Sequence, residues 1–263
     1  MENQIFNESC LDTMSRMEDN SIDLVVTSPP YDNLRTYEKN IDKSWGESVW
    51  KPIISELSRV IKKGGVIVWV VSDATIKGSE TGTSFKQALY FMECGLNLYD
   101  TMIWTKQMVT PTEARYYNGF EYMFVFSKGK PTYLNLIEDV RTKGWGKTYK
   151  SDKVVGYAKD GVKKGHSGVV RTIREFTRRL NYWYIPIGQN KTKHPAVFPE
   201  NLAYDHIKSW SNEGCLVYDP FLGSGTTACM AKLLNRKYVG SEISKDYFKI
   251  SEKRIAQTQE YLF

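Results

Sequence analysis

Short apolar runs separated by amphipathic segments constrain the fold of this chain more than any other feature. Val66–Val71 is the clearest run, because its six residues are all apolar and mostly β-branched. A strand of this kind is buried on both faces, as in a parallel sheet that helices cover on two sides. Ile22–Val26 is a second short buried strand. Strands that alternate with helices predict an α/β fold.

The remaining elements follow the same alternation. A helix is predicted at Glu47–Lys62, where apolar residues recur on one face until Gly64 and Gly65 end it. The other predicted helices are Ser84–Glu93, Glu200–Trp210, Thr226–Leu234 and Lys245–Gln259, and the other predicted strands are Leu98–Trp104, Tyr122–Phe126, Leu216–Asp219 and Tyr238–Glu242. Few elements follow residue 216, so the rest of the sheet must come from the N-terminal half. The two ends of the chain are therefore expected to meet in one sheet.

Composition excludes several classes of protein. Of the 263 residues, 41% are hydrophobic and 25% are charged, which is the balance of a folded globular chain. No stretch approaches eighteen uncharged apolar residues and the N-terminus does not resemble a signal peptide, so a cytoplasmic location is expected. The four cysteines include no Cys-x-x-Cys pair and predict neither a zinc site nor a disulfide framework.

Positive charge is concentrated in one quarter of the chain. Between Lys128 and Lys193 there are sixteen Lys/Arg and five Asp/Glu, a net charge of +11, whereas the whole chain carries +6. We predict that 128–190 is an inserted, loop-rich basic region with one helix at Val170–Leu180, and that 1–127 and 191–263 form the α/β domain. A polyanionic partner and a solvated loop region are both compatible with this charge.

A glycine-rich loop joins the strand Leu216–Asp219 to the helix that follows it. Gly223 and Gly225 allow a tight bend and a close approach to a ligand. Glu242 follows seventeen residues after Gly225, at the end of the next strand, where nucleotide-binding α/β units place a carboxylate for ribose hydroxyls. The third glycine of a dinucleotide fingerprint and the lysine of a P-loop are both missing. A nucleoside ligand without pyrophosphate fits better, and S-adenosylmethionine is the expected cofactor.

A second motif, Thr27-Ser28-Pro29-Pro30-Tyr31, directly follows the strand Ile22–Val26. Two consecutive prolines make the turn rigid and leave carbonyl groups as acceptors. The Ser28 hydroxyl and the Pro29 carbonyl can accept the hydrogens of a planar amine while Tyr31 stacks on its face. Asp73, which follows the strand Val66–Val71, falls at the same edge of the sheet. A role at the site and a role as a helix cap are both consistent with that position.

These residues resemble the S-adenosylmethionine-dependent DNA amino-methyltransferases, in the permuted arrangement called the β class. In that family the catalytic motif comes first, a target-recognition region lies in the middle and the cofactor motif comes last. The matching segments are Ser28-Pro29-Pro30-Tyr31, Asp219-Pro220-Phe221-x-Gly223-x-Gly225-Thr226 and His194-Pro195-Ala196-x-Phe198-Pro199, the last of which packs around the methionine part of the cofactor in the family. The resemblance covers Ile5 to Tyr247 and implies a Rossmann-like sheet.

The resemblance also implies roles for the matched residues. Catalytic roles fall to Ser28, Pro29, Pro30 and Tyr31, and cofactor binding to Asp219, Phe221, Gly223, Gly225, Thr226, Glu242, His194, Pro195 and Phe198. In this family a serine in the catalytic motif accompanies cytosine N4, whereas Asp or Asn accompanies adenine N6. The expected reaction is therefore methyl transfer to N4 of a flipped-out cytosine in double-stranded DNA, within a restriction-modification or phage modification system.

The basic region would contact the phosphates of DNA. The candidate residues are Lys147, Lys150, Lys163, Lys164, Arg171, Arg174, Arg178 and Arg179. The interleaved aromatic residues can stack on bases or pack in the core; they are Trp145, Tyr149, Tyr157, Tyr182, Trp183 and Tyr184. A homodimer and a cognate restriction endonuclease are further candidate partners. Three other functions stay open: adenine-N6 methylation, protein-glutamine methylation, and DNA binding by a catalytically silent subunit.

Overall fold

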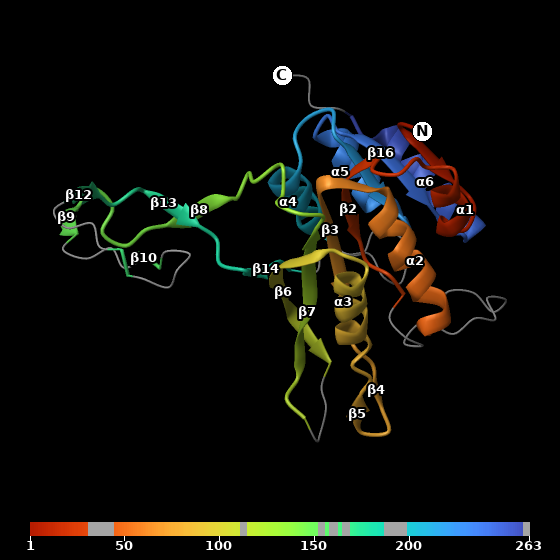
Figure 1. The fold of residues 1–263 in the computed structure, drawn as a ribbon, viewed down its shortest axis with the longest axis horizontal. Helices are drawn as coiled ribbons and strands as arrows, with labels where there is room; N and C mark the ends of the chain where they lie inside the picture. The colour runs from red at the N-terminus through yellow and green to blue at the C-terminus, as the bar shows by residue number, and fades with distance from the viewer. Residues whose placement is uncertain are drawn as a thin grey trace. The chain divides into compact units, whose positions relative to one another are not determined.

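A computed structural model describes residues 1–30, 45–110, 115–151, 156–157, 163–164, 169–186 and 199–259 (Figure 1). The chain divides into two compact units. Unit 1 consists of Met1–Asn135 and Asn181–Phe263, and unit 2 consists of Leu136–Leu180. Unit 2 is therefore shorter than the predicted insert, 128–190.

Unit 1 is built on an eight-stranded sheet in the order β1-β16-β15-β2-β3-β7-β6-β14. The strands are β1 (Gln4–Phe6), β16 (Lys237–Ser241), β15 (Leu216–Asp219), β2 (Ile22–Thr27), β3 (Ile61–Val71), β7 (Asn118–Ser127), β6 (Asn97–Thr110) and β14 (Tyr182–Tyr184). Neighbouring strands are parallel except where β7 pairs with β3 and β6. Because β2 pairs with β15 and β1 with β16, the prediction that both ends of the chain share one sheet is confirmed.

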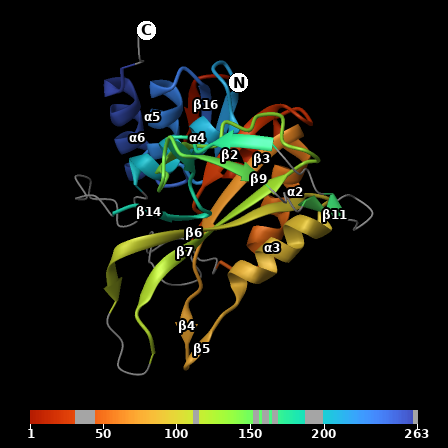
Figure 2. The same cartoon turned by 90° about the vertical axis from the view of Figure 1, so that its left-hand side faces the viewer.

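Helices cover both faces of this sheet (Figures 1 and 2). One face carries α1 (Cys10–Ser15), α2 (Glu47–Val60) and α3 (Thr83–Glu93), and the other carries α4 (Glu200–Trp210), α5 (Thr226–Leu233) and α6 (Lys245–Gln257). Alternate residues of β3 enter the two hydrophobic clusters, with Trp69 in one and Val68 in the other. The predicted burial of Val66–Val71 on both faces is thus confirmed. Among the described helices, none is long and apolar enough to cross a membrane.

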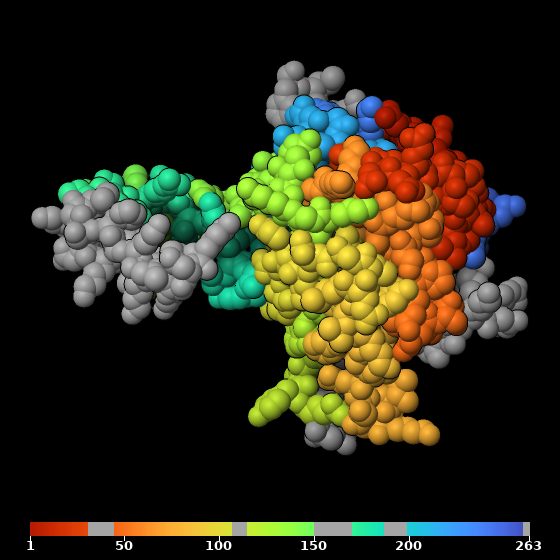
Figure 3. All heavy atoms as spheres, viewed as in Figure 1, coloured from red at the N-terminus to blue at the C-terminus, as the bar shows by residue number. Residues whose placement is uncertain are grey.

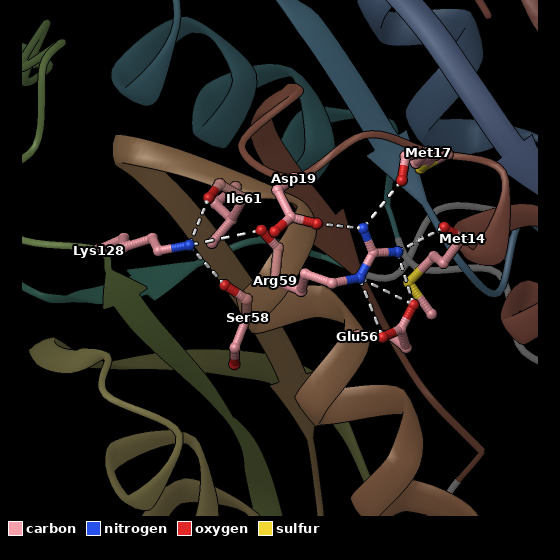
Figure 4. Close-up of polar contacts among 8 residues, drawn as sticks. All are labelled: Met14, Met17, Asp19, Glu56, Ser58, Arg59, Ile61 and Lys128. Carbon is pink, nitrogen blue, oxygen red and sulfur yellow. Dashed lines mark hydrogen bonds and ion pairs between the residues drawn. The ribbon is translucent and has the colours of Figure 1, made fainter.

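The junction between α2 and β3 differs from the prediction. The helix ends at Val60, before the predicted end at Lys62, and β3 begins at the next residue. Lys128 Nζ donates to the carbonyl oxygens of Ser58 at 2.8 Å and Ile61 at 3.1 Å, which satisfies acceptors at the end of the helix (Figure 4). Burial lowers the pKa of Lys128. The glycines lie within β3, and Gly64 has φ +79°, so they do not end the helix.

Arg59 of α2 contacts the segment between α1 and β2 and the end of α1 (Figure 4). Its guanidinium donates to the carbonyl oxygens of Met14 at 2.7 Å and Met17 at 2.9 Å. It also forms ion pairs with Asp19 and Glu56, both at 2.7 Å. Hydrogen bonds with these two carboxylates raise the pKa of Arg59. This contact helps to hold the segment that leads into β2, the strand that ends at the predicted catalytic turn.

Between β3 and α3, the chain forms a short hairpin of β4 (Thr75–Ile76) and β5 (Ser79–Glu80). Asp73, which precedes this hairpin, caps α3 from outside the helix, because its carboxylate accepts hydrogen bonds from Ser84 N at 2.9 Å and Ser84 Oγ at 2.5 Å. Of the two readings of Asp73, the structure therefore shows the helix-capping contact.

Unit 2 contains short antiparallel pairs in its described part: β8 (Glu138–Arg141) with β13 (Phe176–Arg178), β9 (Thr148–Ser151) with β12 (Val169–Thr172), and β10 (Gly156–Tyr157) with β11 (Lys163–Lys164). The prediction of a helix at Val170–Leu180 is wrong, since β12 and β13 occupy most of it. Val169, Val170, Thr172 and Ile173 are β-branched, which favours strand over helix. The segment forms strands because β12 pairs with β9 and β13 pairs with β8.

Candidate functional site

The two sequence motifs meet because β2 and β15 are neighbouring parallel strands. Leu24 pairs with Val217 and Val25 with Tyr218, so both strands end at the same edge of the sheet. Ser28 and Pro29 follow β2, and the glycine-rich loop follows β15. This edge, where the two halves of the sequence meet, is where α/β sheets place their ligands.

Buried hydrogen bonds join the motifs directly. Thr27 Oγ1 donates to Asp219 Oδ1 at 2.6 Å, and Thr227 Oγ1 donates to the Val26 carbonyl at 3.0 Å. Asp219 Oδ1 also accepts from Phe221 N at 3.0 Å. Residues about two hundred positions apart in the sequence are therefore held in one arrangement. Neither threonine was predicted as a site residue, although Thr27 directly precedes Ser28 and Thr227 directly follows the matched loop.

Asp219 lies inside this network rather than on its surface, with only 1% of the residue exposed. Burial raises its pKa to about 6, while the hydrogen bonds from Thr27 and Phe221 act in the opposite direction. Because the chain's own donors occupy the carboxylate, the structure favours a positioning role for Asp219 over direct contact with a ligand.

Local geometry of the glycine-rich loop explains both glycines. Gly223 has φ +53° and Gly225 has φ +86°, values that residues with a side chain rarely adopt. A Cβ at Gly225 would lie 2.9 Å from Ser251 Cβ on α6, so this glycine is also required by packing. Thr226 begins α5 and is buried.

Glu242 orders the same loop. Its Oε2 accepts a hydrogen bond from Gly223 N at 2.7 Å, and its Oε1 accepts one from Ser244 N at 2.8 Å. The residue is 9% exposed. Each carboxylate oxygen can accept more than one hydrogen bond, so the group can still receive hydroxyl donors. Ile243, immediately after it, is 59% exposed and offers an apolar surface that sequence reasoning did not identify.

Arg254 on α6 is a further residue that the sequence did not reveal. Its Nη1 donates to the Ser224 carbonyl and to Ser224 Oγ, each at 2.7 Å, and to Thr226 Oγ1 at 3.3 Å. Its Nη2 forms an ion pair with Glu200, the first residue of α4, at 2.8 Å. One guanidinium therefore connects the loop to two helices. Arg254 lies outside the glycine-rich signature, so no local sequence pattern marks it.

An aromatic group borders the loop. The half-buried ring of Phe221 meets Trp45 edge-on at 5.4 Å between centroids, and Trp69 at 6.1 Å. The indole Nε1 of Trp45 is buried, with no hydrogen-bond partner among the described residues. Together with Glu242 and Ile243, these groups fit a nucleoside: a carboxylate for ribose hydroxyls, apolar surfaces for a flat ring, and glycines that allow close approach.

Not all predicted site residues can be placed. Ser28 and Pro30 are half-buried and Pro29 is buried, directly after β2. Tyr31, His194, Pro195 and Phe198 lie outside the described residues. In the part of the chain that the structure describes, no group of three or more His, Cys, Asp or Glu side chains could hold a metal ion. All four cysteines are free.

Several arginines predicted to contact DNA are paired within unit 2. Arg178 and Arg174 both lie near Glu138, at 3.2 and 3.7 Å, and Arg179 pairs with Asp139 at 2.5 Å. Because strands and not a helix form here, Arg171, Arg174 and Arg178 do not share a helical face. Two other candidates, Lys147 and Arg171, are exposed, and Lys150, Lys163 and Lys164 lie in strands whose side chains are outside the described set.

The interleaved aromatic residues also fall into two groups, exposed and buried. Trp145 and Tyr149 of unit 2 are exposed. In unit 1, Trp183 is buried whereas its neighbours on β14, Tyr182 and Tyr184, are exposed. Alternation along one strand therefore assigns only the middle residue of this triplet to the core.

Comparisons with known proteins agree with this arrangement. A family model described as DNA methylase matches residues 22–253. The orphan methyltransferase M.BamHII of Bacillus amyloliquefaciens is 52% identical over 246 residues, which cover 90% of this chain and 89% of that protein. The type II methyltransferase M.BglII of Bacillus subtilis is 30% identical over 255 residues, covering 95% of this chain and 68% of that protein.

Solved structures share the fold. The PvuII DNA methyltransferase, described as cytosine-N4-specific, has a TM-score of 0.69 at 19% identity and covers 97% of this chain and 86% of its own. TTHA0409 from Thermus thermophilus, complexed with S-adenosyl-L-methionine, has a TM-score of 0.65 at 20% identity and covers 97% and 94%. The Rossmann-like fold is therefore confirmed. Because the family model spans most of the chain, and a relative is identical at half of the aligned positions, this chain belongs to the S-adenosylmethionine-dependent N6/N4 DNA methylases.

Proposed function

We propose that this DNA methyltransferase modifies the exocyclic N4 amine of cytosine. The observation that carries the proposed site of transfer is the buried link between the two motifs: Thr27 donates to Asp219 at 2.6 Å, immediately before Ser28 and Pro29. This link holds the amine-binding turn beside the cofactor loop. Proximity of the two reacting groups is the main source of rate for a transfer that needs no covalent enzyme intermediate.

The turn acts on the electrons of the amine. The lone pair of a cytosine amine is delocalised into the ring, which makes the nitrogen a poor nucleophile. The Ser28 hydroxyl and the Pro29 carbonyl accept the two amine hydrogens, and this bias towards sp³ geometry returns the lone pair to nitrogen. When bound, the cofactor supplies the electrophilic sulfonium methyl group. The rigid backbone at Pro29 and Pro30 keeps the acceptors in place before the base arrives.

The loop after β15 and the end of β16 would hold the cofactor. Glu242 accepts the ribose hydroxyls, and Ile243 covers one face of the adenine. Support comes from the exposed Ile243 side chain beside a carboxylate that already orders Gly223. His194, Pro195 and Phe198 would pack around the methionine part, as they do in the family.

The choice of cytosine rests on Ser28. In this family a serine at that position accompanies cytosine N4, and PvuII DNA methyltransferase, described as cytosine-N4-specific, has the same fold. Adenine N6 is the alternative, because the matching family model covers both reactions.

Region 128–190 would contact duplex DNA, and the exposed Lys147 and Arg171 are the described residues best able to reach phosphates. The relatives differ in setting: M.BglII is named a type II methyltransferase and M.BamHII an orphan methyltransferase. We propose a DNA-modification role of the type II kind, with a cognate endonuclease as a candidate partner.

A base-resolved methylation assay tests the proposal. Purified protein is incubated with S-adenosylmethionine and unmethylated genomic DNA, which is then digested to nucleosides for mass spectrometry. N4-methylcytosine is the expected product. N6-methyladenine would retain the DNA methyltransferase assignment and overturn the choice of base.

Two serines at opposite ends of β2 provide a matched pair of variants. Ser28→Ala should abolish transfer with little change in cofactor affinity, because it removes an acceptor for the amine. Ser21→Ala, just before β2, is the control: the Ser21 hydroxyl is buried and has no hydrogen-bond partner among the described residues. Equal turnover in the two variants would remove Ser28 from the catalytic turn.

A further inference from the structure

Helix α3, which lies on the face of unit 1 turned towards the viewer in Figures 1 and 3, carries a buried amide on its inner side. Gln87 has no exposed surface and shares this side of the helix with the buried residues Ala88 and Phe91. Its Oε1 accepts a hydrogen bond from Trp69 Nε1 at 2.9 Å. Its Nε2 is buried and has no hydrogen-bond partner among the described residues. Half of the amide is therefore unsatisfied, which lowers stability.

Gln87 holds the ring of Trp69 in place. An indole has a single donor, Nε1–H, and Gln87 accepts it. Trp69 has no exposed surface either, so a turn of the ring away from Gln87 would leave this donor without water to replace the lost partner. Phe91 meets the same ring edge-on at 5.2 Å between centroids. One hydrogen bond and one aromatic contact from α3 therefore hold the indole.

Trp69 borders both motifs of the transfer site. On β3, it is the register partner of Thr27, the last residue of β2 and the one before Ser28. Its ring meets that of Phe221, in the loop after β15, at 6.1 Å between centroids and 70° between the ring planes. The backbone of Trp69 is thus paired beside the amine-binding turn, whereas its side chain contacts the cofactor loop.

The ring of Phe221 is placed by packing. Its backbone nitrogen donates to Asp219 at 3.0 Å, but this hydrogen bond does not determine how the side chain turns. Two indoles meet the ring edge-on, Trp69 at 6.1 Å and Trp45 at 5.4 Å between centroids. Phe221 is half-buried, so part of it is accessible to a ligand. A turn of Trp69 would therefore change the surface that Phe221 presents.

We propose that Gln87 is a positioning residue for cofactor binding, which acts through Trp69 on the ring of Phe221. Gln87 holds the indole by its only donor, the indole supports one side of Phe221, and Phe221 contacts the adenosyl part of S-adenosylmethionine. The unsatisfied Nε2 is the cost of this arrangement. The inference rests on the proposed role of Phe221 at the cofactor site.

Calorimetric titration of the full chain with S-adenosylmethionine tests the effect of Gln87. Gln87→Leu keeps a similar volume and removes the acceptor, which leaves the indole free to turn. The dissociation constant should rise about fivefold, the equivalent of one lost hydrogen bond. The melting temperature should change little, because the variant exchanges one unpartnered group, Gln87 Nε2, for another, Trp69 Nε1. Unchanged affinity would overturn the proposal.

Ser58→Ala is the matched control. It also removes a buried polar side chain from a helix on this face of the sheet, because Ser58 Oγ of α2 donates to the Ile54 carbonyl at 2.8 Å. Ser58 has no contact with Trp69, so the dissociation constant should equal that of wild type. An equal rise in the Ser58 and Gln87 variants would show a general effect of helix substitutions and would contradict a specific role for Gln87.

A double-variant cycle tests whether Gln87 acts through Trp69. Trp69→Phe keeps an aromatic ring and removes the donor, so Gln87 has no indole to hold in this background. Gln87→Leu should then leave the dissociation constant of Trp69→Phe unchanged. The double variant should nevertheless be more stable than Trp69→Phe alone, because it no longer buries an unpartnered amide. An equal rise of the dissociation constant in both backgrounds would show that Gln87 does not act through Trp69.

Phe221→Ala separates this inference from the proposed cofactor site. Loss of the ring should raise the dissociation constant for S-adenosylmethionine about tenfold. A rise for Phe221→Ala without a rise for Gln87→Leu would overturn the positioning role alone. An unchanged dissociation constant for Phe221→Ala would overturn the proposed role of Phe221, and the inference with it.

Discussion

Unit 1 and unit 2 are stabilised in different ways. In unit 1, hydrophobic clusters fill the space between the sheet and the helices on both of its faces. In the described part of unit 2, no hydrophobic side chain is buried, and the strands are held by backbone pairing and by exposed ion pairs such as Arg178–Glu138. Exposed ion pairs contribute only about 0–1 kcal/mol each.

The difference fits the two tasks that we propose for the units, methyl transfer in unit 1 and DNA contact in unit 2. Methyl transfer requires groups held in fixed positions, and unit 1 supplies them through buried contacts such as Thr27–Asp219. Binding to a phosphate backbone requires cations near the surface, and unit 2 keeps them in exposed pairs. Substitutions in unit 1 should therefore change stability and cofactor affinity, whereas those in unit 2 should change DNA affinity.

The largest effect is expected at Gly225. Gly225→Ala combines an unfavourable positive φ with a Cβ placed 2.9 Å from Ser251 Cβ, and should lower the free energy of unfolding by about 3 kcal/mol. Gly95→Ala is the matched control, because Gly95 has φ +88° but nothing within 4 Å of the added Cβ. Its loss should be about 1 kcal/mol. Denaturant unfolding measures both. Ser251→Gly should recover part of the loss at Gly225, and equal losses at the two glycines would show that the contact with α6 is unimportant.

The pH dependence of stability should reveal the raised pKa of Asp219. Its pKa in the folded state, about 6, lies above the unfolded value of 3.8, so the folded state binds the proton more tightly. This contribution to stability is present below about pH 4 and is lost as the pH rises through about 6. The Asp219→Asn variant lacks this pH-dependent contribution to stability. From pH 4 to 7, the wild type should lose about 2–3 kcal/mol of unfolding free energy relative to the variant. A constant difference would contradict the raised pKa.

Arg254 should affect cofactor binding more than stability. Arg254→Ala removes the hydrogen bonds to Ser224 and should raise the dissociation constant for S-adenosylmethionine about tenfold, or about 1.4 kcal/mol, by calorimetry. Arg254→Lys should restore part of the affinity. A single ammonium group can reach Ser224, but it cannot contact Ser224 and Glu200 at the same time as the two guanidinium nitrogens do. Lys253→Ala, at an exposed neighbouring position, is the control. A lower melting temperature with unchanged affinity would limit Arg254 to a purely structural role.

The smallest change in stability is expected in unit 2. Glu138→Gln releases Arg174 and Arg178 and should change the unfolding free energy by less than about 1 kcal/mol. DNA binding should become tighter and more salt-dependent, as measured by titration at several salt concentrations. Arg171→Ala should act in the opposite direction, reducing the slope of log affinity against log salt by about 0.9. No change in either slope would argue against phosphate contacts by this surface.

Prediction from sequence was most successful where the local signal was strong. The helix Glu200–Trp210 and the strand at Val66–Val71 were identified correctly, because regular apolar spacing and continuous β-branched runs have few alternatives, although the strand begins earlier, at Ile61. It was wrong at Val170–Leu180, where β-branched residues and basic residues carry conflicting signals. Pairing with strands some twenty to forty residues earlier decided that segment, and no local pattern shows such partners.

By itself, the sequence determined the α/β class, the order of the motifs and the identity of the loop residues, because these depend on local patterns and on short spacing. Only the tertiary structure decided which distant groups share one environment. It showed that Thr27 and Asp219 form a buried pair, and that Arg254 holds the glycine-rich loop from α6. It also assigned Asp73 to the cap of α3. Such contacts join residues that are far apart in the chain, and their energies depend on burial, which follows from packing and not from residue type alone.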